Sequence, residues 1–397
     1  MVKHEYPKKM FMISGIITLF IFLMGFLLGW SLDKYRENDV LQNLRINELN
    51  TQSYFLEKDF INQLMNEEFV VFLDLGSSLL EEISKLKEVF VIDHHEIKSQ
   101  HGENVTFINP RMFGDEEISA AGLTYLFSRE ISRENKDLAN LAVVGMVGDM
   151  LEREISKLNN KIIEDANITI KKGLLLYPAT RPLHKTLEFS SPLFIPGVTG
   201  NPKGVLNLLR EIGIKKDENN RYKSLIELNE EELSKLITAI LLRTNKKGED
   251  LIGNIYLVKL FNKLEDAREL SAMINACSRL GYPHVALSLC LNDRKARKRA
   301  ESIYAKYKQE LVSALNYAEN NLIEGKGYVF LNAGNKIRDT MIGTVASILS
   351  MSHQYKEGTV IVTMSYDKEK IKVSARVAGR NGRNVHELLQ RAMKDIG

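Results

Sequence analysis

Two short apolar runs, each followed by an aspartate, constrain most strongly what this chain can fold into. Residues 69–73 (FVVFL) and 89–92 (VFVI) are rich in β-branched and aromatic side chains, and they end at Asp74 and Asp93. Such runs are typical of buried strands, and residues 79–86 between them have the apolar spacing of a helix. The strand–helix–strand order predicts an α/β fold with a parallel sheet, in which ligands bind at the carboxyl ends of the strands.

The second run leads into Asp93-His94-His95, which places an acid and two imidazoles at that edge. A further aspartate, Asp149, lies at the end of an apolar segment expected to be helical, LANLAVVGMVGDM. Because a carboxylate is costly to bury alone, Asp149 needs a partner or a metal ion. Asp74, His94 and Asp149 offer oxygen and imidazole ligands, which suit Mn²⁺ or Mg²⁺ better than a thiolate-preferring ion. A single aspartate at a strand end is more often a turn or helix cap, so only the combination indicates a metal site.

Bulk composition excludes few classes of function. The chain has 397 residues, enough for two or three domains with cores of their own. Its formal net charge of +3 gives no overall signal for nucleic-acid binding. Cys277 and Cys290 are the only cysteines, so no disulfide framework is expected, and a reducing compartment such as the cytoplasm is favoured.

The N-terminal part contains a long uncharged stretch. Residues 11–30 (FMISGIITLFIFLMGFLLGW) carry no charged side chain, and a helix of this length can cross a bilayer. The stretch therefore predicts a transmembrane helix after a tail of residues 1–10. A signal peptide usually has a shorter apolar core, and a buried core helix usually keeps a polar face. Residues 31–66 are expected to form a helical stalk or linker, so that the protein is membrane-anchored with the rest of the chain in the cytoplasm.

Several motifs in order resemble the DHH/DHHA1 phosphoesterase superfamily, and within it the archaeal RecJ-like single-strand nucleases. The motifs are VVFLDLGSS, VIDHHEI, NPRMFGDEEISAAGLTYLF and AVVGMVGD, followed by LEDARELSAMINACSRLGYPHVALSLCLND, LNAGNKIRDTMIGTVASIL and IKVSARVAGRNGRNVHELLQRA. The resemblance implies a parallel-sheet DHH domain over residues 67–180 and a smaller α/β DHHA1 domain over residues 254–397. Residues 181–253 would be an inter-domain linker with local helices.

The resemblance also implies roles for particular residues of the DHH part. Asp74, His94 and Asp149 match metal ligands of the family, and Asp93 matches the residue that supports the histidine from behind. His95 matches the residue that faces the scissile phosphate. In this family two divalent ions about 4 Å apart activate a water and neutralise charge on the phosphoryl oxygens.

Two residues of the DHHA1 part match substrate contacts. Arg376 matches a contact to the substrate phosphate, which suits the forked geometry of a guanidinium, and Asn335 matches a residue that helps to hold the substrate. The implied cofactor is Mn²⁺ or Mg²⁺, and the implied partner is a single-stranded nucleic acid or oligonucleotide. Replication-fork proteins are further partners suggested by the family, and residues 11–30 would add a membrane.

The sequence departs from the family pattern at both ends. The first motif of the family, of the form His-x-Asp-x-Asp-Gly, supplies three ligands, but no Asp-x-Asp occurs before Asp74. The glycine-rich GGGH-type segment that follows the DHHA1 motifs of the family does not occur before Gly397. We therefore expect fewer than two well-bound ions, impaired hydrolysis and a rearranged or C-terminally incomplete copy of the family pattern.

A basic run, residues 294–308 (RKARKRAESIYAKYK), is expected to be helical. It could guide single-stranded nucleic acid by phosphate contacts, with Tyr304 and Tyr307 for base stacking. A solvated helix face and a contact to anionic lipid are the alternatives.

Three functions remain open on the sequence. The first is Mn²⁺-dependent phosphodiester hydrolysis of single-stranded nucleic acid, with impaired activity. The second is a catalytically inactive nucleic-acid-binding protein or replication scaffold. The third is a membrane-bound cyclic-dinucleotide phosphodiesterase, against which the absence of intervening sensor domains counts.

Overall fold

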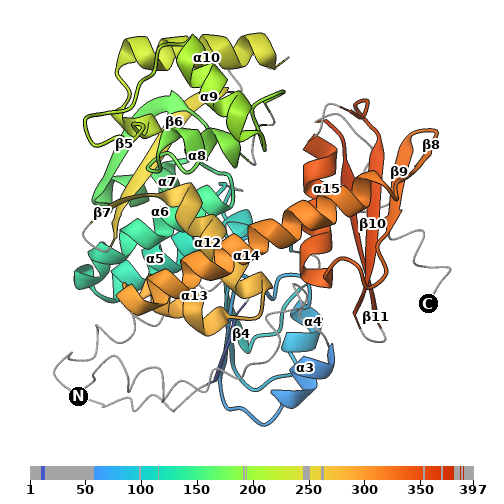
Figure 1. Ribbon diagram of the computed structural model, residues 1–397. Coiled ribbons are helices and arrows are strands. Elements are labelled where there is room, and N and C mark those ends of the chain that lie inside the picture. The colour runs from blue at the N-terminus through green and yellow to red at the C-terminus, as the bar shows by residue number, and fades with distance from the viewer. Residues whose placement is uncertain are drawn as a thin grey trace. The chain divides into compact units, whose positions relative to one another are not determined.

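The computed structural model divides into two compact units (Figure 1). Unit 1 comprises residues 1–275 and 283–298, and unit 2 comprises residues 276–282 and 299–397. The structure describes residues 10–13, 58–97, 100–114, 116–190, 193, 195–244, 251–260, 263–351, 354–367, 370–379, 385 and 388.

A four-stranded parallel sheet in unit 1 carries the first motifs of the sequence. Its strands follow the order β1 (Met10–Ile13), β2 (Val70–Leu73), β3 (Val89–Ile92) and β4 (Val105–Ile108). β2 is buried throughout and β3 nearly so, which explains their continuous apolar sequences. Because the register pairs Leu73 with Ile92, Asp74 and Asp93 leave the sheet side by side at its carboxyl edge.

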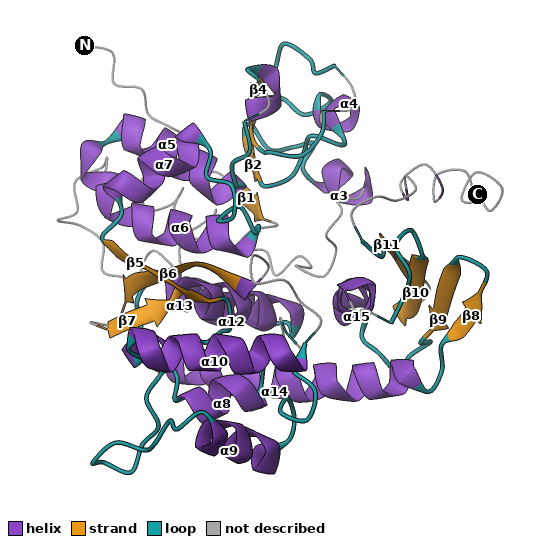
Figure 2. Cartoon of the chain, turned by 90° about the horizontal axis from the view of Figure 1, so that it is seen from above, coloured by secondary structure: helices purple, strands orange, loops and turns teal. Residues whose placement is uncertain are grey.

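Short helices and one apolar helix follow these strands. α3 (Lys58–Gln63) and α4 (Leu80–Ile83) contribute apolar side chains to a core that includes Phe72 and Val91. After β4 the chain forms η2 (Pro110–Met112), α5 (Ala120–Ile131), η3 (Arg133–Leu138), α6 (Ala139–Gly148) and α7 (Lys157–Asp165). The helices α5, α6 and α7 contact one another and lie together in Figure 2. α6 is apolar and largely buried, and it ends at Asp149.

The remainder of unit 1 is built on an antiparallel sheet. Its strands are β5 (Ile168–Leu174), β6 (Ile252–Leu260) and β7 (Lys263–Asp266), and its helices are α8 (Leu183–Glu188), α9 (Pro202–Glu211), η4 (Leu225–Glu227) and α10 (Glu230–Arg243). α12 (Ala267–Arg279) and α13 (Pro283–Cys290) follow. The segment expected to be a linker, residues 181–253, instead supplies most of a hydrophobic core shared by α8, α9, α10 and the strands β5 and β6. Its prolines mark turns between packed helices.

Unit 2 is a mixed sheet with helices. α14 (Arg294–Glu319) leads into the strands β8 (Ile323–Gly325), β9 (Tyr328–Asn332), β10 (Val360–Asp367) and β11 (Lys370–Val377), and α15 (Asp339–Met351) contacts β10 and β11. The sheet has the order β11-β10-β9-β8, in which β9 and β10 are parallel and the other pairs are antiparallel. The expected α/β class is confirmed, whereas the domain boundaries drawn from the sequence stay a prediction.

The expected membrane anchor is wrong. Among the residues that the structure describes, no helix is long and apolar enough to cross a bilayer. Residues 10–13, which should lead into the span, form β1 and pair with β2, because an apolar run suits a buried strand as well as a helix. Residues 14–30 of the expected span and residues 31–57 of the expected stalk lie outside the described residues. The membrane-bound cyclic-dinucleotide phosphodiesterase loses the helix on which it rested.

The crossing of α5 and α6 provides a test of the packing that positions Asp149. A Cβ atom at Gly145 would lie 2.5 Å from the Cβ of Ala121, so the helices would have to separate. We expect Gly145→Ala to lower the free energy of unfolding by about 1–3 kcal/mol, although alanine favours helix more than glycine does. Urea denaturation measures the change. Gly343→Ala in α15 is the matched control, because its nearest neighbour lies at 3.4 Å, and it should be neutral or stabilising. Equal effects of the two substitutions would contradict the close crossing.

Candidate metal centre

Asp74 directs the chain out of the sheet at the end of β2. Its backbone N–H donates to the carbonyl of Ile92 at 2.8 Å, so the residue is still paired with β3. Its φ of 63° lies in the left-handed region, which aspartate tolerates better than most residues because its short side chain can bond locally. Asp74 is therefore held at the sheet edge in a conformation that few other side chains would accept.

His94 lies against Asp74. The Nε2 atom of His94 is 3.3 Å from Oδ1 of Asp74, and 24% and 26% of the two side chains remain exposed. Burial opposes the charged imidazole, but the hydrogen bond and the charge of Asp74, with the charge of Asp149, outweigh it and raise the pKa of His94 to about 9. Without a metal ion His94 is thus a cation between carboxylates at neutral pH.

Asp149 belongs to the same electrostatic group. It caps the C-terminus of α6 and remains open to solvent. Partial removal of its carboxyl group from water, and then the negative charge of Asp74, raise the pKa of Asp149 to about 6, while His94 and His95 oppose this rise. The repulsion between Asp74 and Asp149 is the condition that a bound cation would relieve.

Asp93 is buried and fully engaged by hydrogen bonds. Its Oδ2 accepts the N–H of Ser77 at 3.0 Å, and its Oδ1 accepts the N–H groups of His94 at 2.8 Å and His95 at 3.3 Å. The same Oδ1 lies 2.6 Å from Nδ1 of His95. Burial alone would raise the pKa of Asp93, but these bonds and the charge of His95 lower it to about 2. Asp93 is therefore an orienting carboxylate, and it contacts the ring of His95 and the backbone, but not the ring, of His94.

His95 is more exposed than its neighbours, with 58% of its side chain accessible. The hydrogen bond to Asp93 is the largest effect on its pKa, which is raised. Because Nδ1 is engaged by Asp93, Nε2 is the ring nitrogen left for another molecule. The rings of His94 and His95 meet edge to face, with centroids 4.6 Å apart.

Two buried polar residues that the sequence did not single out support this arrangement. Asn109, after β4, donates from Nδ2 to Oγ of Ser77 at 3.2 Å and to the carbonyl of His95 at 3.0 Å. Ser77 and Asn109 are 0% and 1% exposed, so these bonds are shielded from water. A polar residue directly after a third strand, before Pro110, is the signal that could have identified Asn109.

The donor set fits a hard divalent ion. One ligand atom from each of Asp74, Asp93, His94 and His95 lies within 4.8 Å of the others, and Asp149 interacts with this group through its charge. Carboxylate oxygens and imidazole nitrogens suit Mn²⁺ or Mg²⁺. With Asp93 occupied by hydrogen bonds, the residues left to hold an ion are Asp74, His94 and Asp149.

The neighbouring strand adds no further ligand. β1 runs parallel to β2, so the residues after Ile13 leave the sheet at the edge where Asp74 lies. Residues 14–32 contain no aspartate, glutamate or histidine. The strand is present, but the acidic motif expected at its end is not.

The other two predicted site residues belong to unit 2. Asn335 is exposed in the turn after β9. Arg376 lies on β11, where its Nε donates to Oγ of Ser347 at 3.2 Å and its Nη1 to the carbonyl of Ala375 at 2.8 Å. The structure thus brings together five of the seven predicted residues, all in unit 1, and places Asn335 and Arg376 in the other unit.

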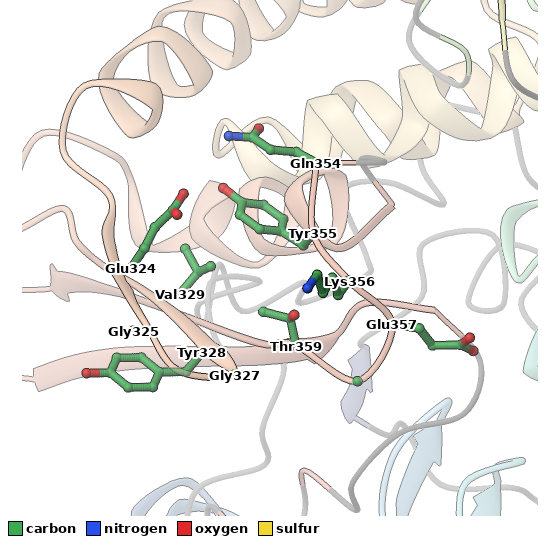
Figure 3. Close-up of a pocket in the computed structure, with 11 residues that line it drawn as sticks. Glu324, Gly325, Gly327, Tyr328, Val329, Gln354, Tyr355, Lys356, Glu357 and Thr359 are labelled. Atoms are coloured by element: carbon green, nitrogen blue, oxygen red, sulfur yellow. The ribbon is translucent and has the colours of Figure 1, made fainter.

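Unit 2 also contains a wide hollow that is chemically different from the metal centre. It has a volume of about 1040 Å³ and lies between the β8–β9 hairpin and residues 354–359 (Figure 3). Its lining combines the acids Glu324 and Glu357 with Lys356. None of the predicted site residues lines it.

Comparisons with known proteins agree with the motifs. Residues 176–252 match a family model described as the DHH-CID domain. An uncharacterized protein of Methanocaldococcus jannaschii is 31% identical over 310 residues, which are 74% of this chain and 67% of that protein.

Two solved structures resemble the chain more distantly. Exonuclease RecJ bound to manganese is 15% identical, with a TM-score of 0.47 over 89% of this chain and 73% of that one. RecJ from Thermus thermophilus in complex with Mn²⁺ has the same identity and TM-score over 89% of this chain, and the match spans 42% of that protein.

The pairing of His94 with Asp74 predicts a pH dependence of the metal-free protein. The pKa of His94 is about 9 in the folded state and 6.5 in its absence. The stabilisation is therefore complete below pH 6.5 and is lost as the pH rises towards 9. We expect a loss on the order of 2 kcal/mol over this range, measured by urea denaturation with a chelator present.

Asp74→Asn is the informative variant, because it removes the charge that holds the proton on His94. It should flatten the pH dependence between 6.5 and 9 and lower the pKa of His94 measured by NMR. An unchanged slope would contradict the pairing.

Proposed function

The chain belongs to the RecJ-like DHH/DHHA1 superfamily, and on that premise we propose that it hydrolyses phosphodiester bonds of single-stranded nucleic acid at the edge of the unit 1 sheet. One observation carries this proposal: the carboxylate of Asp74 and the imidazole of His94 meet at 3.3 Å from adjacent parallel strands, with Asp149 in the same field of charge. Acids and imidazoles at this edge are what a phosphoesterase metal centre requires.

The residues that would hold Mn²⁺ or Mg²⁺ are Asp74, His94 and Asp149. A bound ion of this kind activates a water and neutralises negative charge on the phosphoryl oxygens. To act as a ligand, His94 must release the proton that Asp74 and Asp149 stabilise. Asp93 needs no such change, because its oxygens accept four N–H contacts and continue to orient the following histidine.

His95 is the residue proposed to meet the substrate phosphate. Asp93 fixes its ring through Nδ1 and favours the charged form, so Nε2 can donate to a phosphoryl oxygen. In unit 2, Arg376 is proposed to contact a substrate phosphate through its guanidinium, and Asn335 to help hold the substrate. Both are exposed.

A second candidate is a nucleic-acid-binding protein without hydrolytic activity. The observation that favours it is the lack of acidic side chains after β1, because the family motif expected there supplies three ligands. With only Asp74, His94 and Asp149, the centre has ligands for fewer than two well-bound ions. Weak hydrolysis and simple binding are therefore the two outcomes to distinguish.

Mn²⁺ titration of the full chain, followed by incubation with 5′-labelled single-stranded oligonucleotides, tests the proposal. We expect saturable Mn²⁺ binding and metal-dependent cleavage. The double variant Asp74→Ala/His94→Ala should lose both, with hydrolysis lower by roughly 100-fold or more. The control variant His101→Ala/Glu103→Ala changes an exposed histidine and an exposed acid outside the centre, and it should behave as the wild type.

Two results would count against hydrolysis at this centre. Undiminished cleavage by Asp74→Ala/His94→Ala would place the chemistry elsewhere. Oligonucleotide binding that weakens on Arg376→Ala, with no cleavage by the wild type at any Mn²⁺ concentration, would establish the second candidate instead.

A further inference from the structure

The turn after β4 carries an exposed aromatic side chain. Phe113 is 83% exposed and Met112 is 45% exposed. A Cβ atom placed on the next residue, Gly114, would meet nothing within 4 Å, so space is open beside the ring. Single exposed apolar residues are common on protein surfaces, and exposure alone gives Phe113 no role. Its position in the molecule is what distinguishes it.

This turn is fastened to the backbone of the two histidines of the metal centre. Asn109 donates to the carbonyl of His95 at 3.0 Å, and Nε of Arg111 donates to the carbonyl of His94 at 3.3 Å. Phe113 is therefore held within one turn of residues that contact both histidines.

The turn is also ordered within itself. The side chain of Asn109 accepts the N–H of Arg111 at 2.9 Å, and the N–H of Phe113 donates to the carbonyl of Pro110 at 2.9 Å. The aromatic ring consequently projects from a short helical turn of fixed backbone, which lowers the entropy that a ligand must overcome on binding.

We propose that Phe113 is a stacking surface for an unpaired nucleobase of the substrate, next to the phosphate at the metal centre. This inference rests on the proposed function and specifies how its substrate is recognised. An aromatic ring stacks on any base whose face is free, and a paired base in a duplex has no free face. The exposed cation Arg111 adds positive charge to the same turn, which suits the phosphate backbone.

Oligonucleotide affinity of the full chain tests the stacking, measured by fluorescence anisotropy in Mn²⁺ at one salt concentration. We expect Phe113→Ala to weaken binding about 5- to 150-fold, the range for loss of one stacked base. Phe113→Trp keeps an aromatic face and should bind within about twofold of the wild type. Leu242→Ala is the matched control, because Leu242 is 82% exposed on α10, and it should leave the affinity unchanged.

A scan of oligonucleotides with one abasic position identifies the base. At one position, removal of the base should weaken wild-type binding by the same factor as Phe113→Ala, and the variant should lose nothing further. Wild-type affinity in Phe113→Ala would overturn the inference, and so would a weakened variant that still responds to base removal at every position.

The same experiment separates this inference from the proposed function. A wild type that binds Mn²⁺ and cleaves the oligonucleotide, with Phe113→Ala unchanged in affinity, overturns the stacking surface alone. A wild type that binds neither Mn²⁺ nor oligonucleotide overturns both.

Discussion

The buried carboxylate of Asp93 is the interaction on which the candidate centre depends. A carboxylate that is 1% exposed is tolerated in a protein interior only when hydrogen bonds replace its water. Here the donors come from the turn after β2, through Ser77, and from the two residues after β3. The same group therefore joins two strand ends and orients His95. Asn109 extends the network to β4, so that three neighbouring strands share one polar support.

The charges above this support explain why the centre suits a cation. Asp74 and Asp149 raise the pKa of His94, while Asp74 raises that of Asp149. These opposite tendencies arise because two acids and one base occupy a small, partly buried volume. In the metal-free protein a proton on His94 balances the acids, and a divalent ion would take its place. β1 contributes to the sheet but adds no acid to this edge, which limits the ligand set.

The sequence was most informative where local pattern and chemistry coincide. The apolar runs before Asp74 and Asp93 predicted two buried strands, and their shared edge followed from parallel pairing. β1 was missed because its four residues lie at the border of a long uncharged stretch that reads equally well as a membrane helix. The core of residues 181–253 was missed because frequent prolines suggested a linker, although Leu183, Leu187 and Leu208 are almost fully buried. Ser77 and Asn109 carry no signature until the strands are placed side by side.

The central claim is that Asp74, His94 and Asp149 hold a divalent ion while Asp93 only orients. Anomalous diffraction at the manganese absorption edge, from crystals of the full chain grown with Mn²⁺, tests it most directly. The account predicts an anomalous peak within about 2.0–2.3 Å of a carboxylate oxygen of Asp74 and of a ring nitrogen of His94, with Asp149 beside it and Asp93 still bonded to the N–H of Ser77. A peak coordinated by Asp93, or saturating Mn²⁺ with no peak at this edge of the sheet, would contradict it.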